Sequence, residues 1–137
     1  MYRVIVAGGR DFTDYEFAKE KINEVIESFT EEQCYEIVIV SGKAAGADAL
    51  GERFAEEYGL EIDPYPAKWK VLEGDFPIKI KENQYGKYNA LAGFNRNELM
   101  SQNADALIAL PGGSGTADMV SRATKQGLKI YDYRGGK

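Results

Sequence analysis

The sequence contains no histidine and only one cysteine, Cys34. The absence of histidine excludes Ser-His-Asp catalysis, histidine acid–base chemistry and histidine-ligated zinc from within this chain. A lone cysteine cannot close an internal disulfide and is typical of a reducing compartment. Together with an N-terminus that lacks a signal-peptide layout, it predicts a cytoplasmic protein. Acid–base chemistry would fall to carboxylates, lysine or tyrosine, and the sequence predicts neither a metal site nor a cofactor.

Long apolar runs and an excess of basic charge are also missing. No run is long enough to span a bilayer, so no membrane partner is expected. The net charge of −5 argues against duplex DNA as a partner. It does not argue against a small anion, because a few backbone amides and one or two cations suffice to bind one. The 137 residues, 44% of them hydrophobic, fit a single domain over 1–137 that buries a core without disulfides or metal.

What the chain does contain is an alternation of apolar, β-rich runs with helical patterns. Strands are expected over 2–7, 36–40, 60–65, 105–110 and 128–133. One helix is expected to start near Asp14 behind a Thr13/Glu16 capping box, and a second to end at Gly59 with Tyr58 turned inward. Further helices are expected over 93–103 and up to 126.

This order predicts an α/β, Rossmann-like, doubly wound fold. We expect a five-stranded, mainly parallel sheet of order 3-2-1-4-5 with helices on both faces. Residues from about 70 to 92 fit no regular element, and we expect them to form an irregular loop or an insertion within the domain. In such a fold, ligands bind outside the carboxyl ends of the strands, where the strand order reverses.

Three of the four expected strand-to-helix connections are rich in glycine, and all three lie at the same edge of a parallel sheet. They are Gly8-Gly9-Arg10, Ser41-Gly42-Lys43-Ala44-Ala45-Gly46 and Pro111-Gly112-Gly113-Ser114-Gly115-Thr116. Each loop taken alone is also explained as a tight turn. Three converging loops, each followed by a helix N-terminus with free N–H groups, favour a phosphate site, and Lys43 and Ser114 within them count as candidates.

The charged residues near these loops have two interpretations each. Arg10 and Arg96 are either solvated surface arginines or bidentate phosphate ligands. Asp48 is expected to pack near a helix N-terminus and order the second loop, with direct chemistry as the alternative. Asp118 either compensates the helix dipole or faces the ribose or base of a ligand.

Of two notable aromatic residues, one precedes the segment that fits no regular element and the other lies within it. Trp69 and Tyr85 either stack on a ligand base or cover the pocket, or they pin this segment to the domain. The residues between them, around 71–84, are interpreted as a lid, an oligomer contact or an ornament. These alternatives stay open on the sequence.

Taken in order, several segments resemble one known family. They are residues 6–12, 41–48, 66–69, 85–87, 92–97 with Met100, 105–109 and 115–119. They resemble the YspA-type, cpYpsA-related branch of the SLOG superfamily, which groups the Smf/DprA and LOG Rossmann-like domains. The resemblance implies a Rossmann-like fold that binds nucleotides or nucleotide-derived ligands. Carried over residue by residue, it points to Gly8, Gly9, Arg10, Ser41, Gly42, Asp48, Arg96, Asn97, Gly112, Gly113, Gly115, Thr116 and Asp118.

Two features depart from the relatives. The spacing between Trp69 and Tyr85 looks longer than the family's usual linker. The LOG-type phosphoribohydrolases carry Pro-Gly-Gly-x-Gly-Thr-x-x-Glu, and here Met119 stands at the glutamate position. A thioether cannot stabilise an oxocarbenium-like centre or activate water. Asp118 lies one position earlier, about 100° around a helix, so the hydrolase interpretation is weakened.

Three functions therefore compete. The first is a sensor or sequestering module for a nucleotide-type small molecule that resembles ADP-ribose. The second is a nucleoside-monophosphate N-glycosidase with Asp118 as its catalytic carboxylate, and the third is a DNA-processing accessory of the DprA type, against which the net charge argues. The sequence leaves enzyme activity open. Because related domains often pair, we also expect a homodimer or a higher homo-oligomer.

Overall fold

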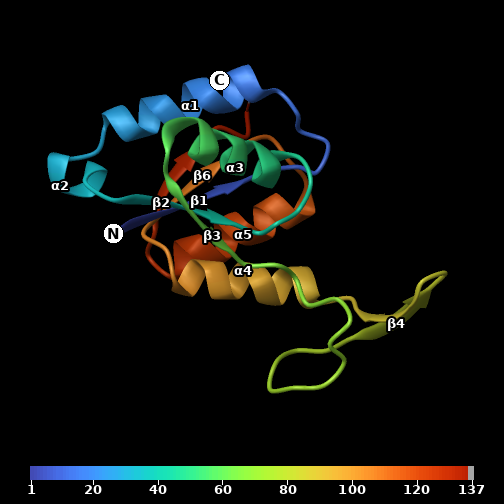
Figure 1. Ribbon diagram of the computed structural model, residues 1–137. Helices are drawn as coiled ribbons and strands as arrows, with labels where there is room; N and C mark the ends of the chain where they lie inside the picture. The colour runs from blue at the N-terminus through green and yellow to red at the C-terminus, as the bar shows by residue number, and fades with distance from the viewer. Residues whose placement is uncertain (136–137) are drawn as a thin grey trace.

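The computed structural model describes residues 1–135 and contains a five-stranded parallel sheet (Figure 1). Its strands are β1 (Tyr2–Ala7), β2 (Ile37–Ser41), β3 (Glu61–Pro64), β6 (Ala106–Ala109) and β7 (Lys129–Asp132). They lie in the order β3-β2-β1-β6-β7, and every neighbouring pair is parallel. The predicted order 3-2-1-4-5 is confirmed, since β6 and β7 are the fourth and fifth of the expected strands.

Helices cover both faces of this sheet. They are α1 (Tyr15–Glu27), the single-turn α2 (Glu31–Cys34), α3 (Ala47–Tyr58), α4 (Ala92–Gln102) and α5 (Ser114–Lys125). In Figure 1, α1 and α3 lie on one side of the strands, and α4 and α5 lie on the other. The alternation along β1 fits this arrangement, because Val4 and Val6 join one buried cluster while Ile5 and Ala7 join the other. The fold is Rossmann-like, as predicted.

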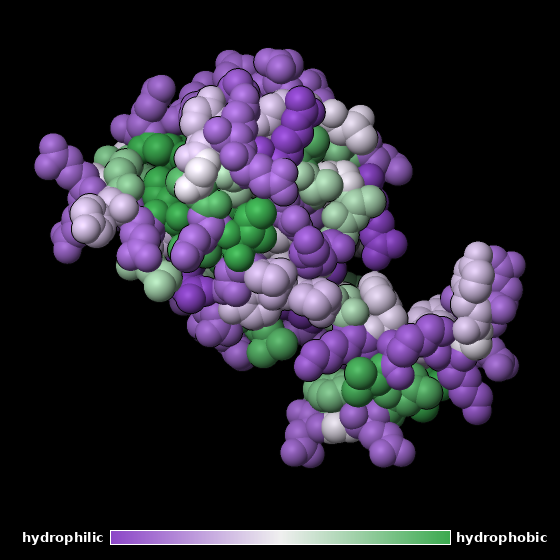
Figure 2. Space-filling view, viewed as in Figure 1, coloured by the Kyte–Doolittle hydropathy of each residue, from purple (hydrophilic) through white to green (hydrophobic). Residues whose placement is uncertain are grey.

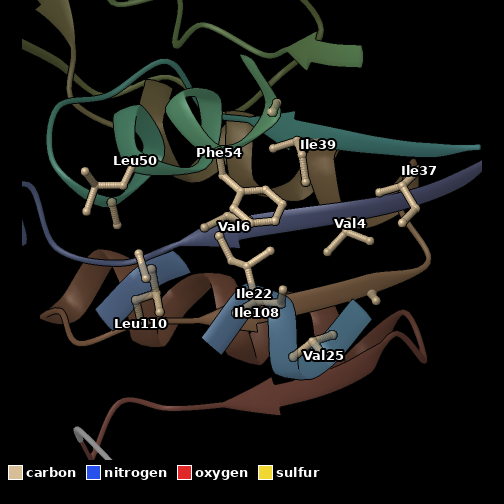
Figure 3. Close-up of a cluster of buried hydrophobic side chains, with 14 of the residues drawn as sticks. Val4, Val6, Ile22, Val25, Ile37, Ile39, Leu50, Phe54, Ile108 and Leu110 are labelled. Carbon is tan, nitrogen blue, oxygen red and sulfur yellow. The ribbon is translucent and has the colours of Figure 1, made fainter. Parts of the chain in front are cut away.

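The larger cluster lies between the sheet and the pair α1 and α3. Figure 3 shows Phe54 of α3 above Val6, with Ile22 of α1 and Ile108 of β6 close by. All four of these side chains are at most 1% exposed. Close packing on this scale fixes α3 against β1, and it therefore also fixes the loop that leads into α3.

Two details of the helices differ from the sequence prediction. Helix α1 is capped by Asp14, whose side chain accepts a hydrogen bond from the Phe17 amide at 3.1 Å, so the predicted Thr13 capping box is wrong by one residue. Tyr58 is 47% exposed rather than turned inward. Its ring lies in the last turn of α3, where it stacks on the outer side of Phe54 with 4.5 Å between centroids.

Residues 66–91, which we call the arm, project from the domain (Figures 1 and 2). The prediction of an irregular segment is wrong for its second half, where β4 (Ile80–Asn83) and β5 (Gly86–Asn89) form an antiparallel hairpin. The hairpin escaped detection because all four β4 residues are exposed and show no alternation of apolar and polar residues. No helix within residues 1–135 is both long and apolar enough to cross a membrane.

Candidate ligand-binding site

The three glycine-rich loops meet at Gly9. Its amide donates to the carbonyl oxygen of Pro111 at 2.9 Å, which joins the first loop to the loop after β6. Its carbonyl oxygen accepts from the amide of Ala47 at 3.1 Å, which joins the first loop to the start of α3. Gly46 precedes α3 with φ of 74°, and a Cβ there would overlap the carbonyl oxygens of Gly9 and Arg10. The junction therefore exists only because Gly46 carries no side chain.

Two further glycines serve close packing. A Cβ at Gly8 would lie 2.6 Å from the Cβ of Ala47. A Cβ at Gly112 would overlap the hydroxyl of Thr116 and approach the amide nitrogen of Gly9 to 2.6 Å. Gly113 and Gly115 differ, because nothing lies within 4 Å of a Cβ at either position. Their open space faces the region where a ligand would lie.

A cavity of about 330 Å³ opens beside this junction, at the carboxyl ends of β1 and β6. This is where the strand order reverses, the position at which α/β sheets bind ligands. Most predicted site residues line it: Gly8, Gly9, Arg10, Gly42, Asp48, Arg96, Asn97, Gly113, Ser114, Gly115 and Thr116. Ser41, Lys43, Gly112 and Asp118 do not line the cavity.

Helix α5 begins at the wall of the cavity without a side-chain cap. Its N-cap is Gly113, and no side chain accepts a hydrogen bond from the first turn. Within residues 1–135, the amides of Ser114, Gly115 and Thr116 donate to no protein acceptor. Free N–H groups and the positive end of the helix dipole therefore face the cavity, and both favour an anion.

Arg96 is held at two edges of its guanidinium. Its Nη1 donates to the carbonyl oxygen of Gly42 at 2.8 Å, and its Nε donates to Oδ1 of Asn97 at 3.3 Å. Its Nη2 donates to no protein atom of the described residues and lies near Gly93, which also lines the cavity. Burial lowers the pKa of Arg96 and the nearby Asp48 opposes that shift, but the group stays cationic. Arg10 supplies a second, exposed cation.

Asp48 is the carboxylate of the cavity lining. Asp48 is 8% exposed, and its Oδ2 accepts a hydrogen bond from the amide of Ala44 at 3.1 Å. Burial raises the pKa of Asp48, while the Ala44 amide, Arg96 and Arg10 act in the opposite direction. The predicted role of Asp48 in ordering the second loop agrees with the bond to Ala44.

Asp118 is not part of the cavity lining, and its carboxylate bonds to a residue of α4 and to Arg122. Its Oδ2 accepts from Nδ2 of Asn97 at 3.0 Å and from Nε of Arg122 at 2.9 Å. Asn97 in turn accepts from Arg96, so a hydrogen-bond chain runs from Asp118 through Asn97 to the cavity arginine. Met119, 1% exposed, occupies the cavity wall beside it. Asp118 therefore has no direct contact with the cavity, which both a role in binding a ribose or base and a role as catalytic carboxylate would require.

Ser41 and Lys43 belong to a separate cluster behind the second loop. The hydroxyl of Ser41 donates to Glu52 at 2.6 Å, and Nζ of Lys43 lies 2.8 Å from the other oxygen of Glu52. Burial alone would raise the pKa of Glu52, but its bonds to Lys43 and Ser41 hold it below the ordinary value. These contacts order the second loop, and they engage the side chains of Ser41 and Lys43 with Glu52 rather than with the cavity.

The sequence prediction missed several lining residues, namely Ala7, Ala44, Ala90, Gly93, Phe94, Met100 and Met119. One signal was available, because positions 93, 96, 97 and 100 share one face of a helix, and two of them were already candidates. Trp69, which had two interpretations, also lines the cavity and lies 36% exposed at its rim. Tyr85 is 77% exposed on the arm and does not line it.

Comparison with known proteins gives a matching family and, among solved structures, proteins with a similar fold. The model of the YspA, cpYpsA-related SLOG family matches residues 2–71. DNA processing protein A (DprA) from Streptococcus pneumoniae superposes with a TM-score of 0.68 at 18% identity, covering 96% of this chain and 50% of that one. TM1055, a structural-genomics target, superposes with a TM-score of 0.61 at 17% identity, covering 95% and 72%. At such identities the likeness shows the fold alone, and the chain spans half the length of that DprA. The comparison with curated proteins found no match.

Proposed function

Because the chain belongs to the YspA, cpYpsA-related SLOG family, whose membership implies binding of nucleotide-derived ligands in general, we propose that its cavity binds a phosphate-bearing nucleotide derivative. The protein then acts as a sensor or sequestering module for a ligand that resembles ADP-ribose. The observation that carries the proposal is the meeting of an uncapped helix N-terminus with a preorganised arginine at one wall.

The phosphate end lies at the start of α5. The free amides of 114–116 supply fixed donors, and Arg96 supplies a cation whose orientation is already set by Gly42 and Asn97. Because those two bonds immobilise the guanidinium before a ligand arrives, little conformational entropy is lost on binding. Arg10 adds charge from the neighbouring first loop, and its exposed side chain is free to close over the phosphate.

The apolar end lies toward the arm. Trp69 and Phe94 line the cavity there and are 36% and 38% exposed. An indole and a phenyl ring at the rim offer the kind of surface on which a nucleobase stacks. A cavity with cationic donors at one end and aromatic rings at the other fits a ligand that carries a phosphate and a base.

The other two functions have less support. An N-glycosidase that uses Asp118 needs this carboxylate at the reacting bond, whereas Asp118 does not line the cavity and is engaged by Asn97 and Arg122. The likeness to DprA rests on the fold alone, and a fold does not carry a function. The net charge of −5 also disfavours a nucleic-acid backbone as the ligand. Neither alternative has an observation of its own in its favour.

Calorimetric titration with AMP, ADP, ADP-ribose, adenosine and inorganic pyrophosphate tests the proposal. We expect the phosphate-bearing nucleotides to bind and adenosine to bind at least tenfold more weakly, because it leaves the helix N-terminus and Arg96 without an anion. Arg96→Gln should weaken nucleotide binding by about ten- to a hundredfold, as expected for the loss of a charge-assisted contact.

Lys125→Gln is the matched control. It removes one positive charge at the opposite, exposed end of α5 and leaves the cavity intact. Its affinities should stay within twofold of the parent, and both variants should keep the parent's melting temperature within a few degrees. The absence of any binding by phosphate-bearing compounds at millimolar concentration would reject the proposal, as would an Arg96→Gln variant that binds as tightly as the parent.

A further inference from the structure

The carboxylate of Asp48 has an oxygen with no protein partner in a nearly closed place. Oδ2 accepts from the Ala44 amide, and no donor among residues 1–135 reaches Oδ1. No fully buried side-chain polar atom of the described residues lacks a partner, so Oδ1 keeps some accessible surface, and Asp48 is a residue of the cavity lining. An 8% exposed carboxylate with an open oxygen needs a donor, because burying it unpaired costs free energy.

Arg96 is near enough to be that donor, yet the structure keeps the two apart. Both side chains lie against Gly42, since a Cβ there would come 2.8 Å from Oδ2 of Asp48 and 3.0 Å from Cδ of Arg96. The guanidinium is turned to the Gly42 carbonyl and to Asn97, and no ion pair forms between Arg96 and Asp48. The cavity wall thus presents a fixed cation and an open anion side by side.

A phosphate cannot fill both positions, because it would be repelled by the carboxylate that it faces. The neighbour of the phosphate in the ligand must instead be a neutral hydrogen-bond donor. In a nucleotide, the groups of this kind that lie next to the phosphate are the ribose hydroxyls.

We propose that Asp48 accepts a hydrogen bond from a sugar hydroxyl of the ligand, so that the cavity selects ribose phosphates over deoxyribose phosphates and over phosphate alone. This inference rests on the proposed nucleotide site. It gives Asp48 the part that the sequence pattern offered to Asp118. Selection of this type is strong, since a site built around a hydroxyl leaves its own polar group unpaired when the hydroxyl is missing.

The parent protein tests this first, without any substitution. Calorimetric titration compares AMP, 2′-deoxy-AMP, 3′-deoxy-AMP, 2′,3′-dideoxy-AMP and inorganic pyrophosphate. We expect the dideoxy compound and at least one monodeoxy compound to bind ten- to a hundredfold more weakly than AMP, the range for a hydrogen bond to a charged acceptor. Equal affinities for AMP and all three deoxy compounds would overturn the inference.

Asp48→Asn then assigns the selection to this side chain. The amide retains an acceptor for the Ala44 amide but loses the charge. It should weaken AMP about tenfold, leave the dideoxy compound within threefold and keep or tighten pyrophosphate. A uniform loss across all ligands would mean a structural role only and would overturn the inference. Glu52→Gln is the control, because it removes the same charge one turn later on α3, outside the cavity, and should leave the AMP-to-dideoxy ratio unchanged.

The two proposals fail in different ways. If pyrophosphate and AMP bind but no deoxy compound is discriminated, only the role of Asp48 is lost. If no phosphate-bearing compound binds, the nucleotide site is rejected and the role of Asp48 falls with it.

Discussion

Two regions beside the cavity are held together differently. In the junction of the three glycine-rich loops at Gly9, backbone packs against backbone, whereas in the arm one buried side chain bonds to several backbone groups. At the junction, Gly9 bonds to Pro111 and Ala47, and Gly46 packs against it with no room for a side chain. In the arm, Asn89 is fully buried and its side chain bonds to backbone groups of three other residues. Both regions border the same cavity, but one is continuous with the core and the other projects into solvent.

The two regions should differ in how much of the structure responds to a substitution. The junction is continuous with the packed sheet, so a clash there has to be relieved by moving α3 or the loop after β6. The sheet within the arm is a two-stranded hairpin with both edges open, and such hairpins are marginally stable by themselves. We therefore expect the junction to respond globally and the arm locally.

The largest expected effect is that of Gly46→Ala. A methyl group at φ of 74° is strained, and it would overlap the carbonyl oxygens of Gly9 and Arg10. The free energy of unfolding, measured by urea denaturation, should fall by more than about 3 kcal/mol. Gly115→Ala is the control, because nothing lies within 4 Å of its Cβ position, and it should change stability by no more than about 0.5 kcal/mol. Equal stabilities of the two variants would show that the junction is not tightly packed.

Asn89→Ala should have the next largest effect, confined to the arm. It removes the acceptor for the amides of Lys79 and Leu91 and the donor to Pro77. Local opening of residues 69–91 should become easier by about 2 kcal/mol, while global unfolding changes by less than about 1 kcal/mol. Hydrogen exchange followed by mass spectrometry measures both quantities.

Asn95→Ala is the comparison for the arm. Asn95 donates to the same Pro77 oxygen at 2.8 Å, but the bond is exposed, so protection of the arm should change little. A loss of protection in Asn89→Ala that extended into β1 or β6 would contradict the distinction between a local and a global region.

Asp118→Asn tests the hydrogen-bond chain that connects α5 to the cavity. It should weaken the bond to Asn97 and thereby loosen Arg96, with about a tenfold loss of AMP affinity, as supporting contacts of a binding site typically give. Glu98→Gln is matched to it, because Glu98 also pairs with Arg122 but makes no contact with Asn97. Its affinity should stay within twofold. An equal loss in both variants would assign the effect to Arg122 rather than to the chain through Asn97.

The sheet order could be predicted because its information is local. Runs such as 2–7 and 105–110 are apolar and short, and helical patterns between them leave only parallel pairing. The hairpin could not, since β4 is exposed on both sides and the two-residue loop Gln84-Tyr85 lacks the usual Asn-Gly or Asp-Gly turn signal. The arm is ordered by the hydrogen bonds of the buried Asn89, and a single residue of this kind leaves no repeating pattern in the sequence from which the hairpin could be predicted.

The residues of the candidate site also fall into a group that could be predicted from the sequence and a group that could not. Loop glycines and Arg96 were predictable because strand ends and helix starts converge at one edge of a parallel sheet. Which carboxylate faces the cavity was not, because that depends on the rotation of each helix about its axis. The packing of α5 against α4 turns Asp118 toward Asn97 and Arg122 and presents Met119 instead, while α3 presents Asp48.

Asp48→Asn should give the smallest effect, and one of opposite sign, because it should stabilise the protein. Burial raises the pKa of Asp48 above its ordinary value, an effect that Glu52 reinforces while the Ala44 amide, Arg96 and Arg10 oppose it. The native state therefore binds a proton more tightly than the unfolded chain does. The stability of the native state falls as the pH rises from the pKa of Asp48 in the unfolded chain to its higher pKa in the native state, and the loss is complete above the native pKa. Asn89 of the arm has no such cost, because its polar atoms are all paired within the protein.

At neutral pH, the variant should exceed the parent by about 0.5–1 kcal/mol in free energy of unfolding, the lower part of the range that single stabilising substitutions commonly give. The gain should shrink as the pH falls and vanish below the ordinary aspartate pKa of about 3.9, where the carboxyl group is protonated in both the folded and the unfolded parent. Urea denaturation at several pH values measures this difference. Glu52→Gln should show the reverse, because its pKa is lowered in the native state and its charge stabilises the fold at neutral pH. A variant Asp48→Asn that is less stable than the parent at neutral pH would place Asp48 with the junction glycines, as a residue kept for packing rather than for a ligand.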